Sequence, residues 1–202
     1  MKIAILDLGT NTFNLLISEI SENSPSTLFK AKIPVKLGQG GIDKNLISPK
    51  AFQRGINALI THKDTIENYG VDQIQAFATS AIRSTTNGKN FVEQVKDQLG
   101  LHINVISGDE EANMIYNGVK HALNLPTKAS LIIDIGGGST EFIIANSEQL
   151  IWKQSFKLGV SRIKELLNPS DPITTSELQT FKSYLEQHLQ PLFEALKNNP
   201  CE

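Results

Sequence analysis

The sequence predicts an α/β fold built from a duplicated unit. Strand and helix patterns interleave, because short apolar runs alternate with longer stretches of helical periodicity. A strand, an Asp-x-Gly turn and a second strand occur twice, as IAILD7-LGTNTFNLLI and as LIID134-IGGGSTEFII. The separation of the two copies is too long for a solenoid repeat and suits a duplicated domain. We therefore expect mixed sheets flanked by helices in two related parts of the chain.

The first half of the chain is expected to form most of one such sheet. Ser48 followed by Pro49 predicts the start of a helix, and Gly70 is typical of the residue that ends one. A second helix is expected to end at Gly100. The strands are predicted at residues 2–8, 12–20, 27–37, 73–78 and 103–106, and the helices at 49–69 and 90–99.

The second half repeats the alternation of strands and helices. Ser107 predicts the N-cap of a helix over 110–123, and Thr174 with Glu177 has the spacing of a capping box. The predicted strands cover residues 131–134, 140–145 and 151–156, and the last helix covers 175–197.

Composition excludes several classes of protein. The net charge of −2 and the pI near 6.1 leave no broad basic field for nucleic acid. The single cysteine, Cys201, excludes an intrachain disulfide and a cysteine-based zinc site, which fits a reducing cytoplasm. No apolar stretch reaches the length of a membrane span, and the apolar N-terminus is broken by polar residues, unlike a signal peptide. We therefore expect neither nucleic acid nor a membrane as a partner.

The two Asp-x-Gly turns have a composition that suits phosphate. Glycine, serine and threonine offer many backbone N–H groups and hydroxyls with little bulk, so such turns can wrap phosphate oxygens. An isolated Asp-x-Gly is also a common hairpin turn, but two copies in matching strand contexts favour a phosphate clamp. The predicted lining residues are Gly9, Thr10, Asn11, Thr12, Gly136, Gly137, Gly138, Ser139 and Thr140.

Five segments resemble a known family. D7-LGTNT and D134-IGGGSTE are similar to the phosphate motifs of the actin-like ATPase superfamily. Together with ATSAIR, VISGDEEANMIYNGV and LGVSR, they resemble the exopolyphosphatase / guanosine pentaphosphate phosphatase family. The resemblance implies ribonuclease-H-like domains, the first over residues 1–122 and an incomplete second over 123–202. Members of the family continue beyond this length with a further Gly-rich motif, and they more usually have Ser-Asn-Ser where this chain has Thr10-Asn11-Thr12.

The resemblance also implies two catalytic residues. Glu111 corresponds to the glutamate that would orient and deprotonate the attacking water. Judged locally, acids in a first helical turn often only cap the helix, and Glu110 is the better candidate for that role. An arginine in a polar turn, such as Arg83, is generally expected to be a solvated surface residue. The resemblance instead favours bidentate contact between Arg83 and a phosphate.

A divalent cation is the expected cofactor. Asp134 and Glu141 flank the second turn at strand ends, and Asp7 occupies the equivalent position before the first turn. Carboxylates in this arrangement suit Mg²⁺, held directly or through water. Glu141 read alone is equally compatible with an ordinary exposed strand residue. The four histidines show no ligand spacing, so we assign them no chemistry.

The sequence thus predicts a cytoplasmic, Mg²⁺-dependent acid-anhydride hydrolase that releases terminal phosphate from inorganic polyphosphate or guanosine pentaphosphate. The resemblance also implies a homodimer. Two alternatives stay open: an ATP-dependent small-molecule kinase of the same superfamily, and a sensor that binds polyphosphate or (p)ppGpp without hydrolysis. Production of a phosphorylated acceptor from ATP would favour the kinase, and binding without turnover would favour the sensor.

Overall fold

The computed structural model describes residues 1–21 and 25–201. Contacts divide the chain into two compact units, Met1–Ile106 and Ser107–Glu202. The sequence placed the domain boundary after residue 122, whereas α4 (Gly108–Ala122) lies within the second of these units. The assignment of this helix to the first ribonuclease-H-like domain stays a prediction.

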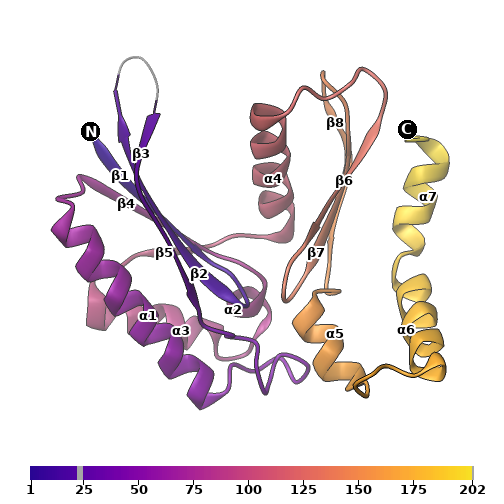
Figure 1. Ribbon diagram of the computed structural model, residues 1–202, viewed down its shortest axis with the longest axis horizontal. Coiled ribbons are helices and arrows are strands. Elements are labelled where there is room, and N and C mark those ends of the chain that lie inside the picture. Colours follow the sequence, from indigo (N-terminus) through magenta and orange to yellow (C-terminus); the bar gives the residue numbers. More distant parts are fainter. Residues whose placement is uncertain (22–24, 202) are drawn as a thin grey trace. The chain divides into compact units, whose positions relative to one another are not determined.

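The first unit contains a five-stranded mixed sheet in the order β3-β2-β1-β4-β5 (Figure 1). The first three strands form an antiparallel meander, and β4 and β5 then add parallel to β1 on its other side. A mixed sheet whose strands interleave with helices along the chain confirms the predicted α/β fold class. The strands are β1 (Lys2–Leu8), β2 (Thr12–Ile20), β3 (Pro25–Pro34), β4 (Gln73–Ala78) and β5 (Ile103–Val105).

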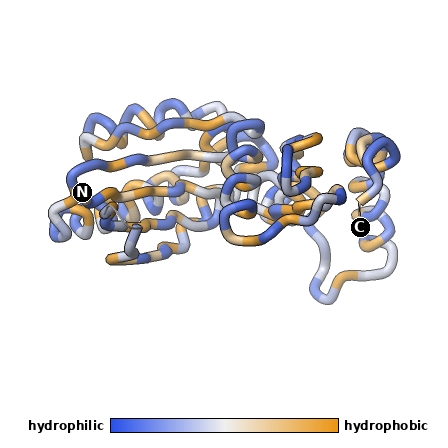
Figure 2. The backbone as a smooth tube through the Cα atoms, turned by 90° about the horizontal axis from the view of Figure 1, so that it is seen from above, coloured by the Kyte–Doolittle hydropathy of each residue, from blue (hydrophilic) through white to orange (hydrophobic). Residues whose placement is uncertain are grey.

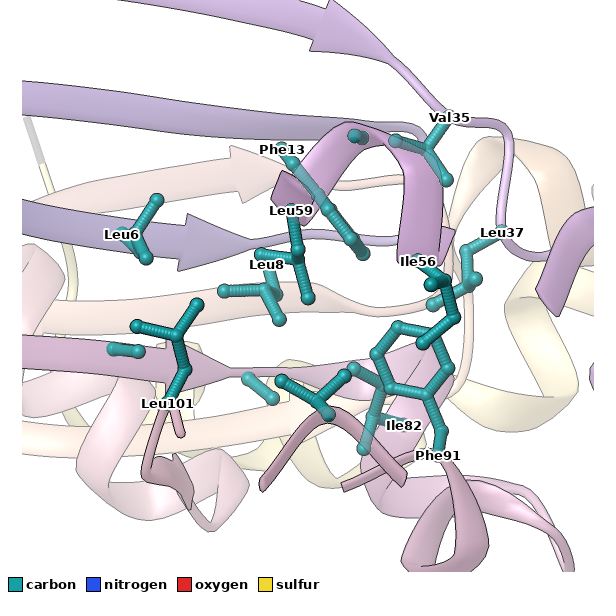
Figure 3. Packing of buried hydrophobic residues seen from close by; sticks show 14 of the residues in the cluster. Leu6, Leu8, Phe13, Val35, Leu37, Ile56, Leu59, Ile82, Phe91 and Leu101 are labelled. Carbon is teal, nitrogen blue, oxygen red and sulfur yellow. The ribbon is translucent and has the colours of Figure 1, made fainter. Parts of the chain in front are cut away.

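The core of the first unit lies on one face of this sheet. Alternate residues of β1 and β2, such as Leu6, Leu8 and Phe13, are fully buried against the helices. Phe91 packs edge-on against Phe13, and both belong to the cluster drawn in Figure 3. The helices are α1 (Pro49–Asn68), α2 (Ser80–Ser84) and α3 (Gly88–Leu99).

The second unit contains a three-stranded antiparallel sheet with helices on both faces. The strands are β6 (Ser130–Ile135), β7 (Thr140–Ala145) and β8 (Leu150–Phe156), in the order β6-β7-β8. On one face, Ile143 and Ala145 of β7 pack with Ala112 and Tyr116 of α4. On the other face, Phe142 packs with residues of the C-terminal helices. These helices are α5 (Val160–Leu167), α6 (Thr175–His188) and α7 (Gln190–Asn198).

The two sheets share one plan. In each, the strand before the Asp-x-Gly turn pairs with the strand after it, and a third strand adds antiparallel on the far side. β1 also carries β4 on its other edge, whereas β6 is an edge strand among the described residues. Ile133 and Ile135 of this strand are exposed.

Several predicted elements differ from those observed. The single C-terminal helix expected over 175–197 is two helices, which meet at Leu189. Pro191 explains the break, because proline lacks the N–H that would continue the helix and is tolerated in the first turn of the next one. The short helices α2 and α5 were not predicted from the sequence. The capping box predicted at Thr174 and Glu177 is observed. Figure 2 shows hydrophobic and hydrophilic residues alternating along the backbone. Among the described residues, no helix combines the length and hydropathy of a membrane span.

Candidate functional site

The first Asp-x-Gly turn connects β1 to β2 and is closed by its own backbone. The N–H of Gly9 donates to the carbonyl of Thr12 over 3.0 Å. A Cβ on Gly9 would lie 3.1 Å from that carbonyl oxygen, so this close approach favours glycine. Thr10 is buried, with an exposed fraction of 4%. The predicted phosphate-binding segment is therefore a compact turn rather than an open loop.

The second turn connects β6 to β7 with the same geometry. The N–H of Gly136 donates to the carbonyl of Ser139 over 3.0 Å, and a Cβ on Gly136 would lie 2.9 Å from that oxygen. Ser139 and Thr140 are buried, and the Thr140 hydroxyl donates to the carbonyl of Leu158. The two sequence repeats therefore form turns that are closed by the same backbone hydrogen bond.

The carbonyl groups of the second turn point at the N-terminus of α5. Gly136 O accepts from the N–H of Val160 at 3.0 Å, and Gly137 O accepts from the N–H of Ser161 at 2.9 Å. Helix N-termini expose N–H groups without intrahelical partners, and here the turn supplies those partners. Because a trans peptide directs its C=O and N–H to opposite sides, the N–H groups of Gly137 and Gly138 point away from α5. They are oriented as donors for an anion on that opposite side.

The first turn is flanked by an Asp–Asn pair. Asp7 and Asn14 are direct cross-strand neighbours, and Asn14 Nδ2 donates to Asp7 Oδ2 over 2.9 Å. Both point to the face of the sheet opposite the buried side chains of Leu6, Leu8 and Phe13. The sequence reading missed Asn14, although superposing the two repeats places it at the position of Glu141.

The second turn is flanked by two carboxylates. Asp134 and Glu141 are direct cross-strand neighbours in the β6–β7 pair, so their side chains lie on one face. Glu141 is only 1% exposed and accepts a 2.6 Å hydrogen bond from the hydroxyl of Ser155. Placing two acids side by side is unfavourable unless a proton or a cation compensates their charge. Their oxygens are the ligand type that Mg²⁺ prefers.

The first turn of α4 lies over the same face of this sheet. Lys153 of β8 is two residues from Ser155, and its ammonium group donates to the carbonyl of Asp109 over 2.9 Å. Glu110 forms the capping box with Ser107: the N–H of Ser107 donates to Glu110 Oε2 at 2.7 Å. This hydrogen bond and the one from the Ser107 hydroxyl, with the nearby charge of Lys153, hold the pKa of Glu110 below its usual range.

The capping role assigned to Glu110 from the sequence is therefore confirmed. The neighbouring acid, Glu111, is half-buried in the same helical turn, and its backbone N–H donates to Ser107 O. The second unit thus carries Glu111, Asp134 and Glu141 on one side of its sheet.

Arg83 belongs to the first unit. It lies in α2, directly after β4, and its Nη1 donates to the carbonyl of Ile106 over 2.9 Å. The half-buried guanidinium therefore braces the chain where β5 ends. Its predicted contact with phosphate stays a prediction, as do the roles of the other residues named from the sequence. No group of three or more His, Cys, Asp or Glu side chains arranged for a metal occurs within residues 1–21 and 25–201.

Comparison with known proteins gives a family match over most of the chain. The sequence model of the Ppx/GppA phosphatase family matches residues 16–199. A bifunctional 3-dehydroquinate synthase/phosphatase of Fusobacterium nucleatum is 35% identical over 170 residues, which cover 80% of this chain and 26% of that protein. A guanosine-5'-triphosphate,3'-diphosphate pyrophosphatase of Aliivibrio fischeri is 36% identical over 156 residues, covering 77% of this chain and 31% of that protein.

A solved structure extends the likeness to three dimensions. The crystal structure of an exopolyphosphatase from Cytophaga hutchinsonii superposes with a TM-score of 0.95 at 36% identity. The superposition covers 98% of this chain and 64% of that structure. The chain therefore spans less than two thirds of this structure and less than a third of the two curated relatives.

Proposed function

Because this chain belongs to the Ppx/GppA phosphatase family, we propose that it supplies the phosphate-binding turns of a phosphoanhydride hydrolase. The substrate is a chain of phosphates, either inorganic polyphosphate or guanosine pentaphosphate. The observation that carries the proposal is the repeated turn, closed by the same N–H···O bond at Gly9 and at Gly136. The names of the similar proteins, an exopolyphosphatase and a guanosine-5'-triphosphate,3'-diphosphate pyrophosphatase, support both substrates equally.

In this proposal the terminal phosphate is bound by backbone N–H groups and hydroxyls of the turns. Glycine at these positions lets the backbone approach the phosphate oxygens closely. Donors that are already oriented need no reorganisation when negative charge shifts during phosphoryl transfer. Arg83 would balance that charge with its guanidinium nitrogens.

The carboxylates beside the second turn fit a divalent cation such as Mg²⁺. Asp134 and Glu141 would hold it, directly or through water, and Asp7 would share that task. When bound, the cation supplies charge neutralisation to the phosphate oxygens. The hydrogen bond from Ser155 orients the Glu141 carboxylate for this role.

Glu111 is proposed as the general base that activates the attacking water. The capping box occupies its neighbour Glu110, so Glu111 is not the residue that caps α4. A positioned general base contributes roughly 10²–10⁴-fold to the rate of such reactions. The homodimer and the cytoplasmic location stay predictions beside this mechanism.

The adjacent acids provide a matched pair of variants. We expect Glu111→Gln in the longest natural form of the protein to lower phosphate release from polyphosphate with Mg²⁺ by about 10²-fold or more, with binding retained. Glu110→Gln should weaken the cap of α4 and lower stability, yet leave turnover largely intact. Retained turnover in the Glu111 variant would refute its assignment as the base.

Phosphate release should be measured on the 202-residue chain as well. Release by the longer form alone would mean that further chain completes the active site. Binding of polyphosphate with no turnover in either form would replace the hydrolase with a sensor. Formation of a phosphorylated acceptor from ATP would replace it with a kinase.

A further inference from the structure

The second turn has a third carbonyl that α5 binds with a side chain. Gly138 O accepts a hydrogen bond from Nε of Arg162 over 3.1 Å, and Arg162 is only 6% exposed. A buried guanidinium is costly to desolvate, so its position beside the turn calls for an explanation beyond packing. A hydrogen bond from a charged donor is also stronger than one between neutral groups.

The equivalent carbonyl of the first turn is bound by backbone instead. Asn11 O accepts from the N–H groups of Val35 and Lys36, at 2.9 and 2.8 Å. Lys36 has a φ of 48°, a conformation that non-glycine residues rarely adopt, so the segment after β3 departs from a relaxed path to make this contact.

An arginine stands behind this segment too. Arg54 of α1 donates from Nε to Val35 O at 2.7 Å and from Nη2 to Lys36 O at 2.9 Å. The Val35 carbonyl and the Lys36 N–H belong to the same peptide group. The hydrogen bonds therefore run from Arg54 through that peptide to the carbonyl of Asn11.

Both chains of hydrogen bonds end at the same position of their turns. The carbonyl of Gly138 shares its peptide with the N–H of Ser139, and the carbonyl of Asn11 shares its peptide with the N–H of Thr12. In a trans peptide the N–H points opposite to the carbonyl, so each arginine acts on an N–H directed away from it. Hydrogen bonds in series polarise one another, which makes the final N–H a stronger donor.

We propose that Arg162 and Arg54 are positioning residues that orient and polarise the N–H groups of Ser139 and Thr12, the last residues of the two turns, toward phosphate oxygens. Arg162 acts directly and Arg54 acts through one intervening peptide. The identity of the anion rests on the proposed function, whereas the orientation of the two N–H groups does not. Neither arginine needs to touch the substrate.

The two repeats serve as controls for each other. In a ¹⁵N-labelled sample of the whole chain, Arg162→Met should move the amide proton of Ser139 upfield and leave Thr12 in place. Arg54→Met should do the reverse. Leu192→Ala, which thins the core of the second unit far from the turn in sequence, should leave both signals in place. Arg162→Lys and Arg54→Lys keep a charged donor, so each amide signal should lie between its positions in the methionine variant and in the unmodified chain. The lysine variant takes the place of a methionine variant in any case where the latter fails to fold.

Binding provides the second readout. Tripolyphosphate titrated into the same samples should bind each methionine variant about tenfold more weakly than the unmodified chain, with the lysine variants between them. Unmoved turn amides in folded arginine variants, or equal movement in Leu192→Ala, would overturn the inference. Amides that shift as expected in a chain that binds no tripolyphosphate would support the positioning role and refute the proposed function.

Discussion

Gly159 provides the sharpest test of how the second turn is supported. It is the N-cap of α5, with φ −72° and ψ 151°, a conformation that any residue adopts without strain. A Cβ at this position would lie 2.4 Å from Gly137 C and from Gly138 C. Gly159→Ala therefore tests close backbone packing, because the folded backbone at this position suits alanine as well as glycine.

The expected loss of stability follows from the contacts that must move. Separating the turn from α5 breaks the hydrogen bonds that Val160, Ser161 and Arg162 donate through their backbone N–H groups. At about 1 kcal/mol for each bond, the loss is about 3 kcal/mol. This agrees with the roughly 1–3 kcal/mol typical of an overpacked interior. With a urea m-value of about 1.5 kcal/mol/M, the midpoint of unfolding falls by about 2 M.

The assay uses the single tryptophan of the chain. Trp152 lies on β8, so its fluorescence reports urea unfolding of the second unit. Gly118→Ala is the matched control, because Gly118 is exposed within α4 and a Cβ there meets nothing within 4 Å. Alanine is the better helix former, so this control should gain up to about 1 kcal/mol. An unchanged midpoint in Gly159→Ala would refute the close packing of α5 against the turn.

Two further predictions concern pH. Hydrogen bonds from the Ser170 hydroxyl and from the backbone of Thr174, with others from the same residues, lower the pKa of Glu177 from 4.5 to about 2. A carboxyl group whose pKa is lower in the folded state than in the unfolded state stabilises the fold at any pH above the unfolded pKa, and this stabilisation is lost as the pH falls toward 2. Glu177→Gln should therefore reduce the loss of stability between pH 4.5 and 2 in acid titrations followed by circular dichroism. Burial lowers the pKa of His62, whose Nε2 donates to Phe13 O. The unfolded chain therefore takes up a proton more readily, so stability should fall as the pH drops below 6.5. His62→Gln should remove this pH dependence of the melting temperature in thermal unfolding. An unaltered pH profile in either variant would contradict its prediction.

Much of the local structure was predictable because its causes are local. Apolar runs on either side of the two Asp-x-Gly turns predict β1, β2 and β7 to the residue, since a strand and the turn that bounds it are encoded by neighbouring residues. The N-cap at Ser107 and the capping box at Thr174 were predicted for the same reason, because the partners of a cap lie within three residues of it. Helix α5 was missed because its short sequence has no such cap, and its first N–H groups bond to the turn instead.

The candidate site also has features with local causes and features that depend on tertiary packing. The sequence alone determined the two turns and the acids beside them, because each motif lies within one strand–turn–strand segment. Only the tertiary structure decided that α4 covers the face carrying Glu141, and that Arg162 and Arg54 support the two turns. These pairings join residues far apart in the chain, so they depend on how strands register and helices pack, and no local periodicity encodes that.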